Sequence, residues 1–215
     1  MRRAPLAGAL ALGLAWAAPA RAQWRVEGAA LVGRAEHRVD AGYGVASSVG
    51  TTLGLRATVR RDELIEAELK ALGGRLAADS VARDDRTMGE LGLRVSVLPL
   101  PWLAVHGVAE VRAYDLVPAL QRWTTLGAGA ELRLAFADGA LRSVVGVTLL
   151  PHVAASGVAA PDMGVASAVG LRMTRGRLVA GLSYDVERYA FAADPRLGRR
   201  REQISGLSLS LGGAW

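Results

Sequence analysis

Hydrophobic and polar residues alternate along most of this chain. In the run LGLRVSV at residues 91–97, every second residue is leucine or valine, and the residues between them are glycine, arginine and serine. Such alternation predicts a β-strand with one apolar face, because successive side chains of a strand point to opposite sides. The same period of two recurs in ten segments, at 24–36, 49–60, 63–73, 89–98, 102–114, 122–136, 140–153, 164–174, 177–191 and 202–215.

The links between these segments alternate in length. Short turns follow the even-numbered segments, at 61–62, 99–101, 137–139 and 175–176, and longer links follow the odd-numbered ones, at 37–48, 74–88, 115–121, 154–163 and 192–201. Asp138-Gly139 is a strong hairpin signal, because glycine readily adopts the positive φ of tight turns. Tilted strands of about ten residues can cross a bilayer. The pattern predicts an all-β fold, a single antiparallel up-and-down transmembrane β-barrel of ten strands (eight is the alternative), with short periplasmic turns and longer outer loops.

Two segments fit the strand pattern less well than the others. Residues 62–73, with the sequence DELIEAELKALG, also fit a helix, because Asp62 could cap it and Glu66 and Lys70 are four residues apart. We assign this segment as a strand, because its loss would leave nine strands and single-chain bacterial barrels have an even number. Pro151 lies inside the seventh segment, so that strand is expected to end or bulge at Leu150.

The N-terminus has the features of a secretory signal peptide. Two arginines precede a short apolar run, and Ala20 and Ala22 are the small residues that a signal peptidase reads. Cleavage would leave Gln23 as the new N-terminus. We therefore expect residues 1–22 to be a cleaved signal peptide and residues 23–215 to form one barrel domain.

Composition narrows the class of protein further. The chain has no cysteine, which excludes disulfides and thiolate metal sites. Removing the leader removes three arginines and no acid, so the formal net charge falls from +6 to +3. This small excess does not indicate a nucleic-acid partner. No apolar run of the mature part is long enough for a transmembrane helix, although 51% of the whole chain is hydrophobic.

The whole mature pattern resembles the small outer-membrane β-barrel proteins of diderm bacteria. The most specific feature is the last segment, in which Leu207, Leu209 and Leu211 alternate with polar residues and Trp215 ends the chain. This ending resembles the signal read by the barrel-assembly machinery, with tryptophan in place of the usual phenylalanine. The resemblance implies a Gram-negative cell-envelope protein in the outer membrane, with periplasmic chaperones, the assembly machinery and membrane lipid as partners. We expect a monomer without a cofactor.

Charged residues on the polar faces form the candidate site. Four even-numbered segments carry a Leu-Arg pair, in which the leucine would face lipid and the arginine the lumen. Most of the acids lie on the odd-numbered segments. The candidate residues of this lumen charge network are Arg56, Arg94, Arg133, Arg172, Glu27, Glu66, Glu68, Glu110, Arg112, Glu131, Asp185 and Glu187.

The network has two interpretations. A ten-stranded barrel leaves little free interior, so arginines paired with acids of neighbouring strands would fill it. A protein with such a plugged lumen would have a structural or surface-binding role. Alternatively, the arginines could line a narrow, porin-like pore that prefers anions, provided that the acids turn away from the axis. We expect the plugged lumen.

Enzymatic alternatives have weaker support. His152 and Ser156 could belong to a lipid-modifying esterase, but four residues along a strand separate side chains by about 13 Å. A protease similar to the ten-stranded omptins could use acids of the outer loops (Asp84, Asp85 and Asp162) with His152, but the Asp-x-His pairing of that family is absent. The three histidines of the chain do not have metal-ligand spacing. We therefore expect no enzyme and no catalytic residues.

A soluble periplasmic barrel of lipocalin type remains the other alternative. Its strands also alternate, and the low aromatic content of 5% fits it, because lipid-facing barrels usually carry aromatic girdles. A soluble barrel, however, needs polar residues on its outer face and has no reason to end in an aromatic residue. The apolar face of almost every segment therefore favours the membrane barrel.

Overall fold

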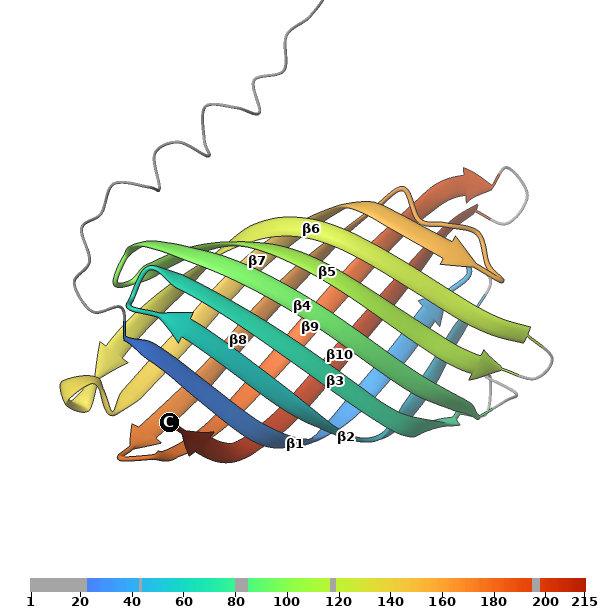
Figure 1. Cartoon of the computed structure of the whole chain (residues 1–215). Coiled ribbons are helices and arrows are strands. Elements are labelled where there is room, and N and C mark those ends of the chain that lie inside the picture. The colour runs from blue at the N-terminus through green and yellow to red at the C-terminus, as the bar shows by residue number, and fades with distance from the viewer. Residues whose placement is uncertain (1–22, 43, 80–84, 117–118, 195–197) are drawn as a thin grey trace, which may run out of the picture.

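The chain forms one closed barrel of ten antiparallel strands, in which β1 also pairs with β10 (Figure 1). The computed structural model describes residues 23–42, 44–79, 85–116, 119–194 and 198–215, so the expected signal peptide lies outside the described residues. The strands are β1 (Trp24–Asp40), β2 (Val45–Arg61), β3 (Ile65–Ala78), β4 (Arg86–Leu100), β5 (Leu103–Leu116), β6 (Ala119–Phe136), β7 (Leu141–Ser156), β8 (Met163–Arg175), β9 (Leu178–Asp194) and β10 (Gly198–Ala214).

The strand count and fold class predicted from alternation and closure are confirmed. The ambiguous segment 62–73 belongs mostly to β3, which pairs with β2 and β4 along its length. The expected strand lengths were wrong, because several strands continue beyond the apolar part of the pattern. β1 runs eight residues past Val32 to Asp40, for example. Much of the sequence expected in long outer loops is therefore strand, since hydrogen bonding between neighbours continues where the outward residues are already polar.

Two local predictions about irregular backbone also hold. β7 bulges at Pro151, where Leu126 pairs with His152 and Ala128 with Leu149, so two β7 residues face one residue of β6. The turn from β6 to β7 is a short 3₁₀ segment at Ala137–Gly139, and Gly139 has φ of 84°. Both features keep the strands paired on either side, so the barrel stays closed there.

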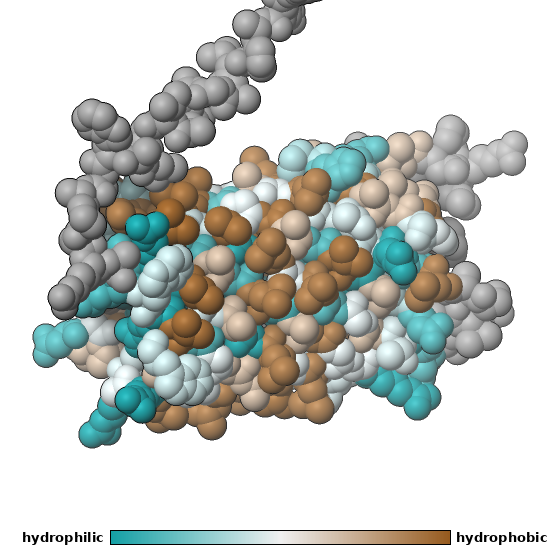
Figure 2. Space-filling model, viewed as in Figure 1, coloured by the Kyte–Doolittle hydropathy of each residue, from teal (hydrophilic) through white to brown (hydrophobic). Residues whose placement is uncertain are grey.

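An apolar belt surrounds the barrel. Figure 2 shows hydrophobic side chains across the middle of the visible face and hydrophilic ones gathered towards both ends. Leu53, Leu93, Leu132 and Leu209 come from four strands and are each 45–63% exposed. Large aliphatic side chains exposed on almost every strand are the exterior of a barrel that contacts lipid. Among the described residues, no helix is long and apolar enough to cross a membrane.

The two ends of the barrel differ. We call the end where β1 begins and β10 ends, with the β2–β3, β4–β5, β6–β7 and β8–β9 turns, the turn end, and the opposite end the loop end (Figure 1). At the turn end, Val26 and Trp215 exchange two backbone hydrogen bonds of 3.0 and 2.8 Å, which complete the seam between β1 and β10. The first and last strands are thereby paired over their whole membrane-spanning part.

Strong curvature brings backbones close together inside the barrel. A Cβ atom placed on Gly129 of β6 would lie 2.2 Å from the Val147 carbonyl oxygen and 2.8 Å from Nε2 of His106. Only glycine fits there, because any side chain would push β6 away from β7. The width of the interior itself follows from the ten tilted strands, and inward side chains fill most of it.

Candidate functional site: the charged lumen

The candidate charges lie inside the barrel. They follow from the alternation of each strand: Leu93 and Val95 of β4 are about half exposed on the outside, and Arg94 between them lines the lumen. Eleven of the twelve candidate residues line one of two interior cavities, and the twelfth, Glu27, forms an ion pair with the lining residue Arg172. The structure thus brings the predicted set together in one space.

Arg112 of β5 is the centre of the network. Its side chain is 4% exposed and forms ion pairs with carboxylates of three strands. Its guanidinium lies 2.8 Å from Glu90 of β4, 2.6 Å from Glu110 of its own strand and 2.8 Å from Glu187 of β9. Lys70 of β3 adds a second cation, 2.6 Å from the other oxygen of Glu90. This cluster ties opposite walls of the barrel together, because β5 and β9 are not neighbours.

A second cluster lies closer to the turn end, around Arg133 of β6. Both terminal nitrogens of Arg133 donate to Glu66 of β3, at 2.8 and 3.2 Å, in the forked geometry that makes arginine–carboxylate pairs strong. Its Nε donates to Glu131 at 2.6 Å, and Arg94 donates to the other oxygen of Glu131 at 3.0 Å. Arg60 also donates to Glu66, at 3.0 Å from its Nε. Each of the three guanidiniums of this cluster therefore donates to at least one of its two carboxylates.

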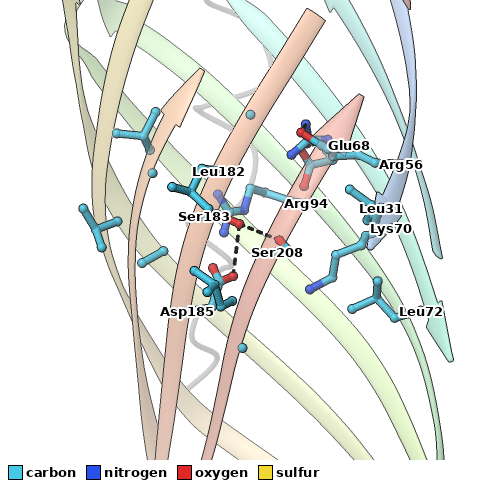
Figure 3. Close-up of a pocket in the computed structure, with 18 of the residues that line it drawn as sticks. Leu31, Arg56, Glu68, Lys70, Leu72, Arg94, Leu182, Ser183, Asp185 and Ser208 are labelled. Carbon is cyan, nitrogen blue, oxygen red and sulfur yellow. Dashed lines mark hydrogen bonds and ion pairs between the residues drawn. The ribbon is translucent and has the colours of Figure 1, made fainter. Parts of the chain in front are cut away.

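Arg172 and Arg56, two further candidate arginines, each have one carboxylate partner among the described residues. Arg172 of β8 forms an ion pair with Glu27 of β1. Arg56 of β2 lies 4.0 Å from Glu68 and donates to the Ser210 hydroxyl at 3.1 Å. Figure 3 shows Arg56 beside Glu68.

Asp185 of β9 differs from the other acids of the network. Its only hydrogen bond among the described residues comes from the Ser183 hydroxyl at 3.4 Å, and Ser183 also shares a 2.8 Å hydrogen bond with Ser208 (Figure 3). Asp185 lines both interior cavities, which have volumes of about 220 and 100 Å³. Cavities of this size and polarity can hold a few water molecules, which would complete the hydrogen bonding of this carboxylate.

The expected pairing between neighbouring strands was wrong for most of these pairs. Arg133 and Glu66 are three strands apart around the barrel, and so are Arg172 and Glu27. Arg133 also pairs with an acid two residues away on its own strand. Long arginine side chains in a narrow tilted barrel reach across the lumen as easily as they reach the next strand.

The lumen changes character towards the loop end, where apolar and aromatic side chains replace the charges. The ring of Trp123 packs against Tyr189 and Phe191 at centroid distances of 5.2 and 6.3 Å, in edge-to-face arrangements. Leu76 and Met88 of the opposite wall are also buried in this cluster. We call this group the aromatic core; its buried residues are Ala35, Leu76, Met88, Tyr114, Trp123, Leu150, Val153, Tyr189, Phe191 and Ile204.

A buried polar group accompanies the aromatic core. His37 stacks on Tyr114 with ring centroids 4.8 Å apart. Arg86 lies 2.9 Å from its Nδ1, and Glu202 lies 2.8 Å from its Nε2. Because a guanidinium can only donate, Nδ1 must accept and Nε2 must carry the proton that it donates to Glu202. Arg200 forms a further ion pair with Glu202, so the histidine is fixed as one neutral tautomer.

Sequence reasoning missed several members of these clusters. Lys70, Glu90 and Arg60 pair with predicted residues, and the group of His37 and Glu202 was not expected. The first three share the parity of the predicted residues on their strands, so applying the alternation rule to every charged residue would have found them. Nothing in the sequence marks His37 and Glu202 as partners, because 165 positions separate them.

The residues considered for catalysis do not join the lumen. His152 is exposed at the β7 bulge and faces away from the neighbouring buried Val153. Ser156 is exposed at the end of the same strand, and Asp85 forms an ion pair with Arg75. Asp162 is exposed, and Asp84 lies outside the described residues. Among the described residues, no group of three or more histidines and acids is arranged to hold a metal ion.

No protein-family model and no curated protein matches this sequence. The barrel is similar to the translocator domain of the autotransporter NalP from Neisseria meningitidis, with 12% identity and a TM-score of 0.44 over 85% of this chain and 87% of that one. It is also similar to Neisserial surface protein A (10%, 0.37, 88% and 97%) and to Ail, the attachment invasion locus protein of Yersinia pestis (13%, 0.38, 88% and 98%). Likeness at this level carries no information about activity.

Proposed function

We propose that this chain is a plugged outer-membrane β-barrel that acts as a structural or surface-binding protein and has no catalytic activity. The observation that carries the proposal is the arrangement of Arg112, whose guanidinium is shared by three carboxylates directly below the aromatic core. A charge held by three opposite charges does not offer a site to a passing ion.

Two groups of side chains would block the passage of ions through the lumen. In the turn-end half, ion pairs such as Arg133–Glu66 join strands that are three apart and so extend across the lumen. In the loop-end half, Trp123 is 1% exposed and Tyr114 is fully buried, so aromatic rings occupy the path. An ion would have to displace both, at the expense of packed apolar area and of paired charges. A narrow anion-preferring pore remains the alternative that the experiment below would reveal.

Recording from planar bilayers tests the proposal. The purified folded protein is expected to insert and to show no steady conductance. A double variant, Trp123→Ala with Tyr189→Ala, is expected to conduct, because it removes two of the largest side chains of the aromatic core. Stable anion-selective conductance of the native protein, lost when Arg56 and Arg94 are both changed to Ser, would contradict the plug and establish the pore.

We also propose that the chain is exported with cleavage before Gln23, escorted by periplasmic chaperones and inserted by the barrel-assembly machinery. The apolar belt and the aromatic C-terminus support this route. The mature protein is expected in the outer-membrane fraction, beginning at Gln23 and migrating on gels with heat-modifiable mobility. Recovery from the soluble periplasm without detergent would contradict the proposal and favour the lipocalin-like alternative.

A further inference from the structure

One stretch of the outer wall, at the loop end of β1, β9 and β10, carries arginines without carboxylate partners. Arg34, Arg38, Arg188 and Arg201 are exposed, and among the described residues none of them forms an ion pair. We call these four residues the arginine patch. Exposed arginines on the outside of a membrane barrel differ from those of the lumen, because their charge is available to a group outside the protein.

The strand register places the patch in a compact array. Arg38 of β1 pairs with Gln203 of β10, and Gln203 pairs with Arg188 of β9, so the two arginines flank one glutamine. Neighbouring strands lie about 4.8 Å apart, which puts the Cα atoms of Arg38 and Arg188 about 10 Å from each other. Arg201 is the next outward residue on β10. Side chains of this length can converge on a single group above Gln203.

Two acids on the same outward face reduce the charge of the patch but do not cancel it. Glu36 accepts a hydrogen bond of 3.0 Å from the Ser47 hydroxyl, and Asp40 accepts one of 3.0 Å from the backbone nitrogen of Gly42. Arg188 is held in place by a 3.1 Å hydrogen bond to the side-chain oxygen of Gln203. Both carboxylates keep their charge, and Asp40 pairs with Arg201 in the strand register, so four guanidiniums and two carboxylates leave a local formal excess of two positive charges.

The patch also lies at the edge of the apolar belt. Arg34 pairs with Leu207, which pairs with Tyr184, and these two side chains are 49% and 44% exposed. Val32, the preceding outward residue of β1, is 46% exposed. A molecule on this surface would therefore meet apolar side chains below and guanidiniums above. A phospholipid has this shape, with acyl chains in the bilayer and a phosphate at its surface.

The rest of the described loop end lacks such an array. Arg75 on β3 forms an ion pair with Asp85 at 3.0 Å. Arg122 is an exposed arginine on β6, far around the barrel from β10. Among the described residues, the excess positive charge of the loop end is thus concentrated on three adjacent strands and is not a ring around the barrel.

We propose that the arginine patch binds the phosphate of a lipid headgroup and so holds an anionic lipid against β1, β9 and β10. Arginine suits this role, because its planar fork donates two hydrogen bonds to two oxygens of one phosphate and because it remains charged at any physiological pH. The inference rests on the proposed membrane location, and it adds a specific lipid partner to it.

The test uses the folded full-length mature chain in nanodiscs of phosphatidylcholine that contain a minor fraction of phosphatidic acid. Lipids that stay bound are counted by native mass spectrometry after release from the disc. The native protein is expected to retain phosphatidic acid in preference to phosphatidylcholine. The double variant Arg38→Gln with Arg188→Gln is expected to retain it about thirtyfold less, because each arginine near a membrane surface contributes about 1 kcal/mol to the binding of anionic lipid and the variant lacks two.

A matched control separates a specific site from general attraction. The double variant Arg122→Gln with Arg175→Gln removes the same charge from exposed outer positions away from the patch, and it is expected to retain phosphatidic acid as the native protein does. Equal losses in the two double variants, or no preference in the native protein, would overturn the inference. Displacement of the lipid by inorganic phosphate would also overturn it, in favour of a free-anion site. Failure of the native protein to enter nanodiscs would instead contradict the membrane location itself.

Discussion

The two halves of the lumen are filled by different kinds of side chain: apolar and aromatic ones near the loop end, and paired charges near the turn end. Near the loop end, Trp123 and Phe191 pack as in the core of a soluble protein. Nearer the turn end, paired charges such as Arg133 and Glu66 extend across the lumen and line one of its cavities. The strands are continuous through both halves. On β6, for example, the inward residue is Arg133 in the charged half and Trp123 in the aromatic half, so the type of inward residue along one strand determines what fills the lumen at each height.

Because one half is filled by apolar side chains and the other by paired charges, the two halves should respond to mutation in different ways. An apolar core loses stability roughly in proportion to the contacts and area removed. A network of buried charges loses more than the deleted pair, because each remaining partner becomes a buried charge without a counterion.

Arg112→Met should be the most damaging single substitution. It leaves Glu90, Glu110 and Glu187 close together without their shared cation, and loss of one partner from a buried pair costs about 3–5 kcal/mol. Unfolding by urea in detergent micelles measures the change in free energy of unfolding. The matched control is Arg25→Met, which removes an arginine that is 43% exposed and should cost less than about 1 kcal/mol.

A rescue experiment sharpens this prediction. Adding Glu110→Gln to Arg112→Met should restore part of the lost stability, because it removes one of the mutually repelling carboxylates. If Arg112→Met unfolds at the same urea concentration as the native protein, the network is not a stabilising element and the interpretation of the turn-end half is wrong.

Trp123→Ala tests the aromatic core and should cost about 3 kcal/mol, because it leaves a cavity among well-packed rings. Trp123→Phe is the control. The indole nitrogen has no hydrogen-bond partner among the described groups, so phenylalanine loses only part of the buried area and should cost far less. Equal losses for the two variants in urea unfolding would show that packing does not determine stability at this end.

Acid should lower the free energy of unfolding through His37, by less than Arg112→Met or Trp123→Ala does. His37 lies above the apolar belt, since the outward residues of β1 are polar from Arg34 onwards. Burial lowers the pKa of His37, although its hydrogen bond to Glu202 acts in the opposite direction. The other charged or titratable groups near the ring are Arg86, Arg112 and Tyr114.

The sign of this effect follows from the direction of the shift. The folded protein keeps His37 neutral, whereas the unfolded chain binds a proton as the pH falls below about 6.5. The contribution of His37 to the free energy of unfolding should therefore be constant above that pH and should decrease below it. Urea unfolding at about pH 7.5 and about pH 5.5 measures the decrease, and a His37→Gln variant should show less of it. An identical decrease in the variant would assign the effect to other groups.

Trp215→Ser should have the smallest effect on stability and a clear effect on assembly. The side chain is 69% exposed, and its hydrogen bonds to Val26 are made by the backbone, which serine retains. The unfolding free energy of the refolded variant should stay within about 0.5 kcal/mol of the native value. Its amount in the outer membrane of expressing cells should fall. Normal membrane levels would show that Trp215 is not an assembly signal.

Alternation in the sequence determined most of the architecture. It predicted ten strands, the lipid-facing leucines and the inward charges, since side-chain direction in a strand depends only on whether a position is odd or even. The assignment of residues 62–73 needed one further argument, because that segment fits a helix locally and only barrel closure requires the strand. Parity also applies to Lys70 and Glu90, which sequence reasoning left out of the network.

The partner of each lumen side chain depends on the tertiary structure. Arg133 and Glu66 are 67 positions apart, and Arg112 and Glu187 are 75 apart, yet each pair meets inside the barrel. Those meetings depend on strand tilt and on the stagger with which the sheet closes, and neither is encoded in the local period of two. The aromatic core depends on the same closure, because Trp123 and Phe191 come from strands that are not neighbours. A local pattern fixes which way a side chain points, whereas its partner is fixed only when the closed barrel brings distant strands together.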